Sequence, residues 1–159
     1  MRRGLPQWLV PSAKPELVQV LNGTKPAARL YVGSRTGDMR RWARRLGLFA
    51  STDRDGYVVL SRKSAASRRI LELDRRPGRH TLALGMFLGY PRCCSRAAAR
   101  CGDEGIDAMH DKIAARRFHG RFEMINPAAY RQGGTILSHV PCSHRCVASL
   151  SLAARAGRC

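Results

Sequence analysis

Two short segments of the chain carry thiols where helices are expected to begin. Cys93 and Cys94 come just after a proline, and so does Cys142, with Cys146 four residues further on. The amide N–H groups and the positive end of the helix dipole lower the pKa of a thiol at such a position and favour the thiolate. Because one helical turn separates Cys142 from Cys146, both sulfurs can lie on one face. These four residues are therefore candidates for one shared site.

Four convergent thiolates would suit zinc or an iron–sulfur cluster, since both are held by tetrahedral sulfur or mixed sulfur and nitrogen ligands. His139 and His144 lie close to the second segment and are further candidate ligands. The spacings are C-C and C-x₃-C, whereas paired C-x₂-C segments are more typical of structural zinc sites. We predict a metal site made of the following residues: Cys93, Cys94, Cys142, Cys146 and His139.

The same residues allow other chemistries. In a redox pair, one thiolate attacks and a second thiol resolves the intermediate. A nucleophilic cysteine activated by a nearby histidine would make Cys93, Cys94 and Cys142 the catalytic candidates of an enzyme acting on a small molecule or a peptide. Cysteine also packs readily in cores as a small hydrophobe. We expect Cys101 and Cys159 to take no part in the chemistry.

The two cysteine segments resemble the prokaryotic family catalogued as domain of unknown function 483. In that family a Gly-Tyr-Pro-x-Cys-Cys segment is paired with a later Pro-Cys-Ser-x-x-Cys segment. Here the corresponding stretches are Leu88-Gly89-Tyr90-Pro91-Arg92-Cys93-Cys94 and His139-Val140-Pro141-Cys142-Ser143, with Cys146 before a Ser/Leu/Ala helix. The resemblance covers residues 77–156, and His144 stands where a proline would be expected. It implies that the four cysteines act together and brings no established reaction.

Charge points to a second class of function. Among 159 residues, 29 Lys and Arg outweigh 11 Asp and Glu, for a net charge of +18. Basic side chains bind phosphates by releasing their counterions, so an Arg-rich nucleic-acid-binding module with structural cysteines is the alternative function. The helix expected over 36–48 carries Arg40, Arg41, Arg44 and Arg45 beside an apolar face. Such Arg-rich faces could bind an anionic ligand or nucleic acid, but a core helix with a solvated basic face is the favoured interpretation.

The elements that must position these residues follow from hydrophobic periodicity and turn residues. We expect a single domain with an irregular arm over 1–11, a strand–helix–strand–helix half over 12–76 and a cysteine-motif half over 77–159. The expected strands are 28–33, 57–60 and 135–140, and the expected helices include 64–73, 80–88, one starting at 91 and a last one containing Cys146. This order predicts an α/β or α+β fold with a small mixed sheet and a helix-rich C-terminal half.

Composition narrows the class of protein. A hydrophobic content of 44% is too high for a wholly disordered chain. The longest apolar run, Leu82–Tyr90, is far shorter than the roughly 20 residues of a membrane-spanning helix, so no membrane association is expected. No apolar segment of signal-peptide type follows the basic start, which predicts a cytoplasmic protein with reduced thiols. The oligomeric state is not indicated by the sequence.

Overall fold

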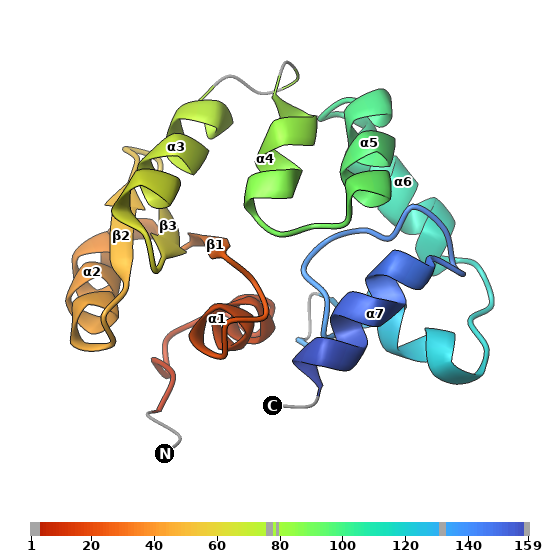
Figure 1. Cartoon of the computed structure of the whole chain (residues 1–159), viewed down its shortest axis with the longest axis horizontal. Helices are drawn as coiled ribbons and strands as arrows, with labels where there is room; N and C mark the ends of the chain where they lie inside the picture. The colour runs from red at the N-terminus through yellow and green to blue at the C-terminus, as the bar shows by residue number, and fades with distance from the viewer. Residues whose placement is uncertain (1–3, 76–77, 79, 131–132, 158–159) are drawn as a thin grey trace.

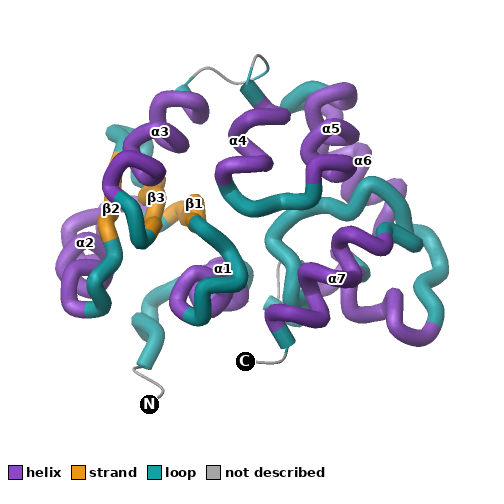
Figure 2. The backbone as a smooth tube through the Cα atoms, viewed as in Figure 1, coloured by secondary structure: helices purple, strands orange, loops and turns teal. Residues whose placement is uncertain are grey.

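The chain combines a small antiparallel sheet with many helices, which is the α+β form of the predicted fold. The computed structural model describes residues 4–75, 78, 80–130 and 133–157. Figure 2 shows the three strands gathered on one side of the molecule, with helices and loops making up the remainder. No helix within the described ranges has the length and apolarity that crossing a membrane requires.

The sheet is built around β3 (Tyr57–Ser61), which pairs with β1 (Ala27–Tyr31) on one side and β2 (Phe49–Thr52) on the other. Both pairs are antiparallel, so the expectation of a mixed sheet is wrong. Alternate residues of β3 point to opposite faces. Val58 and Leu60 pack with α1 (Ala13–Leu21) and α2 (Thr36–Arg45), whereas Val59 packs with α3 (Ser64–Asp74). Both faces of the central strand are therefore covered.

Two segments differ from the sequence-based expectation. The helix expected over 36–48 ends at Arg45, and the chain then enters β2 through Gly47, whose φ of +71° favours glycine. The strand expected over 135–140 is wrong, because this segment is a loop. Its carbonyl groups accept hydrogen bonds from side chains instead of a neighbouring strand: Thr135 Oγ1 donates to the Leu137 carbonyl at 2.7 Å, and Gln19 Nε2 donates to the Ile136 carbonyl.

The C-terminal half is helical and has a core of its own. Its helices are α4 (Thr81–Phe87), α5 (Arg92–Cys101), α6 (Gly105–Ala114) and α7 (Val147–Ala156), with short 3₁₀ turns at Gly120–Ile125 and Pro127–Ala129. Helix α4 packs on α5, α5 packs on α6, and α7 packs on the first of these turns. In Figure 1 these helices lie on the side of the molecule away from β2 and α2. Cys94 and Cys146 are part of this core, together with Ile125, Leu137 and Leu150.

A buried polar network joins the two halves. The Lys25 Nζ atom lies 2.5 Å from the Glu16 carboxylate and 2.9 Å from the Ser138 hydroxyl, and it stands 4.4 Å from the centre of the Tyr90 ring. The Tyr90 hydroxyl donates to Glu16 at 3.3 Å. Burial lowers the pKa of Lys25 and outweighs the opposing effect of Glu16. Through this network, α1 is held against the loop that precedes the second cysteine segment.

Candidate metal centre

The starts of α5 and α7 bring the four cysteines together. Pro91 is the N-cap of α5, so Cys93 and Cys94 occupy its first turn, as expected from the proline. Cys146 is the N-cap residue of α7 and lies just outside the helix, not within it. Cys142 belongs to the loop before α7. Burial of Cys94 and Cys146 in one apolar cluster holds the two helix starts against each other.

The four sulfur atoms form a compact group. All of them lie within 4.8 Å of one another. The Sγ atoms of Cys93 and Cys94 are 3.8 Å apart, those of Cys93 and Cys146 are also 3.8 Å apart, and those of Cys94 and Cys146 are 3.6 Å apart. These four cysteines are free thiols with no disulfide among them. The prediction that both segments build one four-cysteine site is confirmed.

Backbone amides donate to this sulfur group. The amide of Cys142 donates to Cys94 Sγ and the amide of Ser149 donates to Cys146 Sγ, each at 3.4 Å. Such bonds favour thiolates, as do the N-termini of the two helices. The nearest basic neighbours in sequence, Arg92, Arg96 and Arg145, are all exposed. The site therefore offers its sulfurs the partial positive charge of two amides and of two helix N-termini.

Cys94, Cys142 and Cys146 differ in how readily they lose a proton. The pKa of Cys146 is lowered to about 4, first because the Cys94 thiol donates a hydrogen bond to its thiolate. For the same reason, and through burial, the pKa of Cys94 is raised. Burial and the nearby sulfurs raise the pKa of Cys142 to about 12. Hydrogen bonds from its neighbours thus favour the thiolate of Cys146, whereas burial and the nearby sulfurs favour the protonated form of Cys142.

One edge of the sulfur group reaches solvent. Cys94 is 2% exposed and Cys146 is 5% exposed, Cys142 is half-buried, and Cys93 is exposed. An ion can enter at the Cys93 edge without unfolding the core. The sulfurs of Cys94 and Cys146 are held in place by the apolar core around them.

His139 lies beside the sulfur group and not within it. Its Nε2 atom lies 2.9 Å from the Ser149 hydroxyl, and that hydroxyl lies 3.2 Å from Cys94 Sγ. Burial lowers the pKa of His139 to about 3, with a smaller contribution from the charge of Lys25. His139 therefore contacts the sulfur group through Ser149 and not directly. Groups in such a position orient the side chains that bind a metal.

His144, the further candidate ligand, is not part of the sulfur group, and neither is Cys101, which was expected to take no part in the chemistry. The ring of His144 packs edge-on against Phe118, with ring centres 6.2 Å apart. Cys101 Sγ is 3.7 Å from the sulfur of Met109. Cys159 lies outside the described residues. Ser149 was missed in the sequence, because a serine inside a Ser/Leu/Ala helix carries no signal for contact with both a cysteine and a histidine.

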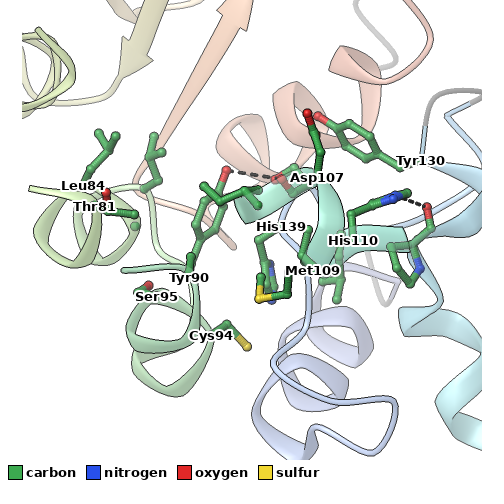
Figure 3. A pocket seen from close by; sticks show the side chains of 18 residues that line it. Thr81, Leu84, Tyr90, Cys94, Ser95, Asp107, Met109, His110, Tyr130 and His139 are labelled. Atoms are coloured by element: carbon green, nitrogen blue, oxygen red, sulfur yellow. Dashed lines mark hydrogen bonds between the residues drawn. The ribbon is translucent and has the colours of Figure 1, made fainter. Parts of the chain in front are cut away.

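A pocket of about 330 Å³ adjoins the site, and Cys94 belongs to both. Figure 3 shows its walls, with Tyr90 and His139 close together; their ring centres are 5.0 Å apart. Most of the remaining wall comes from α4, α5 and α6. No pattern in the sequence indicates this cavity, since its walls come from segments far apart along the chain.

The basic helix predicted from the sequence presents its arginines to solvent. Arg40, Arg41, Arg44 and Arg45 of α2 are all exposed. Phe49, at the start of β2, is 49% exposed and borders a shallow depression together with Arg40 and Arg44. This aromatic neighbour was missed in the sequence, where residue 49 follows the expected helix and has no visible relation to its polar face.

Comparison with known proteins finds no matching family model, no matching curated protein and no matching solved structure. The interpretation of the site therefore rests on its geometry and on the chemistry of its four thiols.

Proposed function

We propose that the protein binds one zinc ion through Cys93, Cys94, Cys142 and Cys146. The observation that carries this proposal is the separation of the sulfur atoms. Around a tetrahedral ion with Zn–S bonds of about 2.3 Å, sulfur atoms stand about 3.8 Å apart. Three of the sulfur pairs lie at 3.6 to 3.8 Å before any adjustment to an ion.

The same distances favour a single ion over an iron–sulfur cluster. In an iron–sulfur cluster the four cysteines are divided among two or four iron atoms, so sulfur ligands on different irons stand further apart than around one ion. Here all four sulfurs fit within 4.8 Å. Zinc is preferred to other mononuclear metals because four thiolates in tetrahedral array form its usual structural site.

The role of the zinc in this proposal is structural. Four protein ligands leave no open coordination position for water or substrate, whereas catalytic zinc keeps one. The ion would tie the start of α5 to the start of α7 across the interface that Cys94 and Cys146 already share. The amides of Cys142 and Ser149 would stabilise the negative charge of the zinc–thiolate group. Zinc binding would then contribute directly to the stability of the C-terminal half.

Metal analysis of protein purified under reducing conditions tests the proposal. We expect about one zinc ion per chain, and replacement by cobalt(II) should give the absorption spectrum of a tetrahedral thiolate site. Cys93→Ser and Cys146→Ser should each weaken zinc binding by more than the tenfold to hundredfold typical of losing a supporting group around a metal site. Competition with a chromogenic chelator measures this change.

Cys101→Ser is the matched control, because Cys101 lies on α5 but outside the sulfur group. It should leave zinc content unchanged. Metal-free protein in which one thiol reacts rapidly with iodoacetamide below pH 7 would contradict the zinc proposal. That result would favour the redox or nucleophilic alternative, in which the exposed Cys93 or the Cys146 thiolate attacks.

We also propose that the protein is related to domain of unknown function 483 and that it is located in the cytoplasm. A reducing compartment keeps the four thiols available for zinc. Both cysteine segments of that family's pattern contribute to the sulfur group, which is what a shared metal site would require of them. Expression of the tagged protein in its native host followed by fractionation tests the location, and detection in an extracytoplasmic fraction would contradict it.

The exposed arginines of α2 support a second candidate function, binding of single-stranded nucleic acid. Arg40 and Arg44 would contact phosphates, and Phe49 beside them offers a face on which a base can stack. Binding of a labelled oligonucleotide should weaken steeply as salt concentration rises.

A pair of double variants tests this candidate. Arg40→Ala with Arg44→Ala should reduce the slope of log affinity against log salt by about 0.7 for each phosphate that the protein no longer neutralises. Arg68→Ala with Arg69→Ala removes the same charge from the exposed side of α3 and should change the slope less. Equal effects of the two double variants would contradict a nucleic-acid site on α2, because they would show that only the overall positive charge attracts the oligonucleotide.

A further inference from the structure

The pocket beside Cys94 differs in charge from the rest of the molecule. The chain carries 29 basic residues, yet none of the 18 residues lining this pocket is Lys or Arg. The one carboxylate in the lining belongs to Asp107, which is exposed. An anionic ligand would find no countercharge among these walls. The lining therefore favours an uncharged ligand with a mostly apolar body.

One polar atom in this region lacks a partner. The Nδ1 atom of His139 is buried and has no hydrogen bond within the described part of the chain. The other nitrogen of the ring, Nε2, is engaged with Ser149. A buried polar atom without a partner is costly, and a residue that lines a cavity can gain its missing partner from a ligand.

Neighbouring groups decide whether Nδ1 donates or accepts. As a thiolate, Cys94 can only accept from the Ser149 hydroxyl. As a thiol beside a Cys146 thiolate, it donates its single proton to that thiolate, and its own sulfur again accepts from Ser149. In both states the Ser149 oxygen is left to accept from His139 Nε2–H. Nδ1 then carries a lone pair, since a neutral imidazole has one donor and one acceptor.

We propose that this pocket binds a small uncharged molecule with an apolar body and one hydroxyl group, which donates a hydrogen bond to Nδ1 of His139. The volume of about 330 Å³ suits a ligand with a single ring or a short chain. The apolar side chains of α4, α5 and α6 contact the body of the ligand, and the ring of Tyr90 forms part of the wall beside His139. Bound in this way, the ligand lies next to Cys94, which links the pocket to the sulfur group.

Two matched probes test the proposal on the full chain. 4-Fluorophenol carries the hydroxyl donor, and 4-fluoroanisole is the same ring with that donor replaced by a methyl ether. Titrations followed by ¹⁹F NMR line broadening measure both affinities. We expect the phenol to bind about tenfold more tightly, because the ether buries Nδ1 without a partner.

Variants locate the binding. His139→Phe keeps an aromatic ring but removes Nδ1, so it should abolish the preference for the phenol. Ala98→Phe fills the pocket from α5 and should weaken both probes at least tenfold. Arg100→Phe introduces the same ring at an exposed position of that helix and should weaken neither. Circular dichroism of each variant verifies that it is folded.

Three results would overturn the proposal: binding of neither probe, equal binding of both, or a preference for the phenol that survives His139→Phe. The zinc content of each sample is measured in parallel. Because the direction of the hydrogen bonds is the same with a metal or a proton on the sulfurs, a zinc-free protein that prefers the phenol would contradict the proposed function and support the pocket. A zinc-loaded protein that binds neither probe would support the proposed function and contradict the pocket.

Discussion

The imidazole of His139 stays neutral at pH values where a free histidine takes up a proton. It lies between the Ser149 hydroxyl and the ring of Tyr90, and the ammonium of Lys25 is close enough to disfavour a second positive charge. Burial is the main cause of the lowered pKa, about 3 against an ordinary 6.5. The His139 imidazole therefore takes up a proton less readily in the folded protein than in the unfolded chain.

This difference predicts a loss of stability in mild acid. Below pH 6.5 the unfolded chain binds a proton at residue 139 that the folded protein binds only near pH 3, so the free energy of unfolding decreases as pH falls through this window. Between pH 7 and pH 5 the contribution of His139 is about 2 kcal/mol. His139→Gln should remove that part of the pH dependence, as measured by urea denaturation at both pH values.

His119→Gln is the control, because His119 is exposed to solvent. Its pH dependence should match that of the unsubstituted protein. If the two variants retained the same pH dependence, the neutral buried imidazole would be ruled out as its source.

At the scale of elements, helices α4 and α5 approach each other at a glycine. A Cβ atom on Gly85 would stand 2.5 Å from Ser95 Oγ and 2.9 Å from Ser95 Cβ. Rotation of the serine cannot relieve the second contact. Gly85 and Ser95 also line the pocket, so the close approach of the two helices sets one of its walls.

Gly85→Ala should therefore force α4 and α5 apart and lower the free energy of unfolding by about 1–3 kcal/mol. Gly37→Ala makes the same change in α2, where the nearest atom is the end of the Arg41 side chain at 3.7 Å. There the alanine should stabilise the helix by up to about 1 kcal/mol. Chemical denaturation of both variants measures the contrast, and a neutral Gly85→Ala would contradict the close packing.

The elements that could be predicted from the sequence are those with local causes. The turn before β3 forms because the Asp53 carboxylate accepts from the amides of Asp55 and Tyr57, a local pattern typical of Asp in turns. The start of α5, which carries Cys93 and Cys94, follows from Pro91, whereas the helix start expected at Pro141 is wrong, because α7 begins only at Val147. By contrast, β2 is half-exposed and has no clear alternation, and it is a strand because the free edge of β3 pairs with it.

The same distinction applies to the site. The four cysteines could be identified as partners because both segments carry local signals of a helix start. The positions of His139 and Ser149 and the pocket walls depend on contacts between distant segments, which no local pattern records. The residues 135–140 are rich in strand-forming types, yet their carbonyl groups accept hydrogen bonds from side chains. Gln19 of the other half donates to Ile136, and the Tyr90 hydroxyl donates to Ser138.

At the scale of the whole molecule, one buried ion pair connects the sheet half to the cysteine half. Lys25 and Glu16 belong to the first half, and their partners Tyr90 and Ser138 belong to the second. The side chain of Lys25 is 0% exposed and that of Glu16 is 4% exposed. Removing one member of such a pair leaves the other charge buried without compensation, which is far costlier than losing a pair on the surface.

Lys25→Met should lower the free energy of unfolding by about 3–5 kcal/mol, because the Glu16 carboxylate then lies buried beside the Tyr90 hydroxyl alone. The double variant with Glu16→Gln removes the uncompensated charge and should recover much of that loss. Arg69→Met breaks an exposed ion pair with Glu72 and should cost at most about 1 kcal/mol.

Two spectroscopic probes follow the halves separately during urea denaturation of these variants. Trp8 and Trp42 fluoresce in the first half, and cobalt(II) bound at the four cysteines absorbs in the second. If the buried pair couples the halves, Lys25→Met shifts both transitions to lower urea, and the double variant moves both back. A shift of the tryptophan transition alone would mean that the cysteine half gains no stability from Lys25, because its own core and the cobalt(II) added in the experiment would then be sufficient to stabilise it.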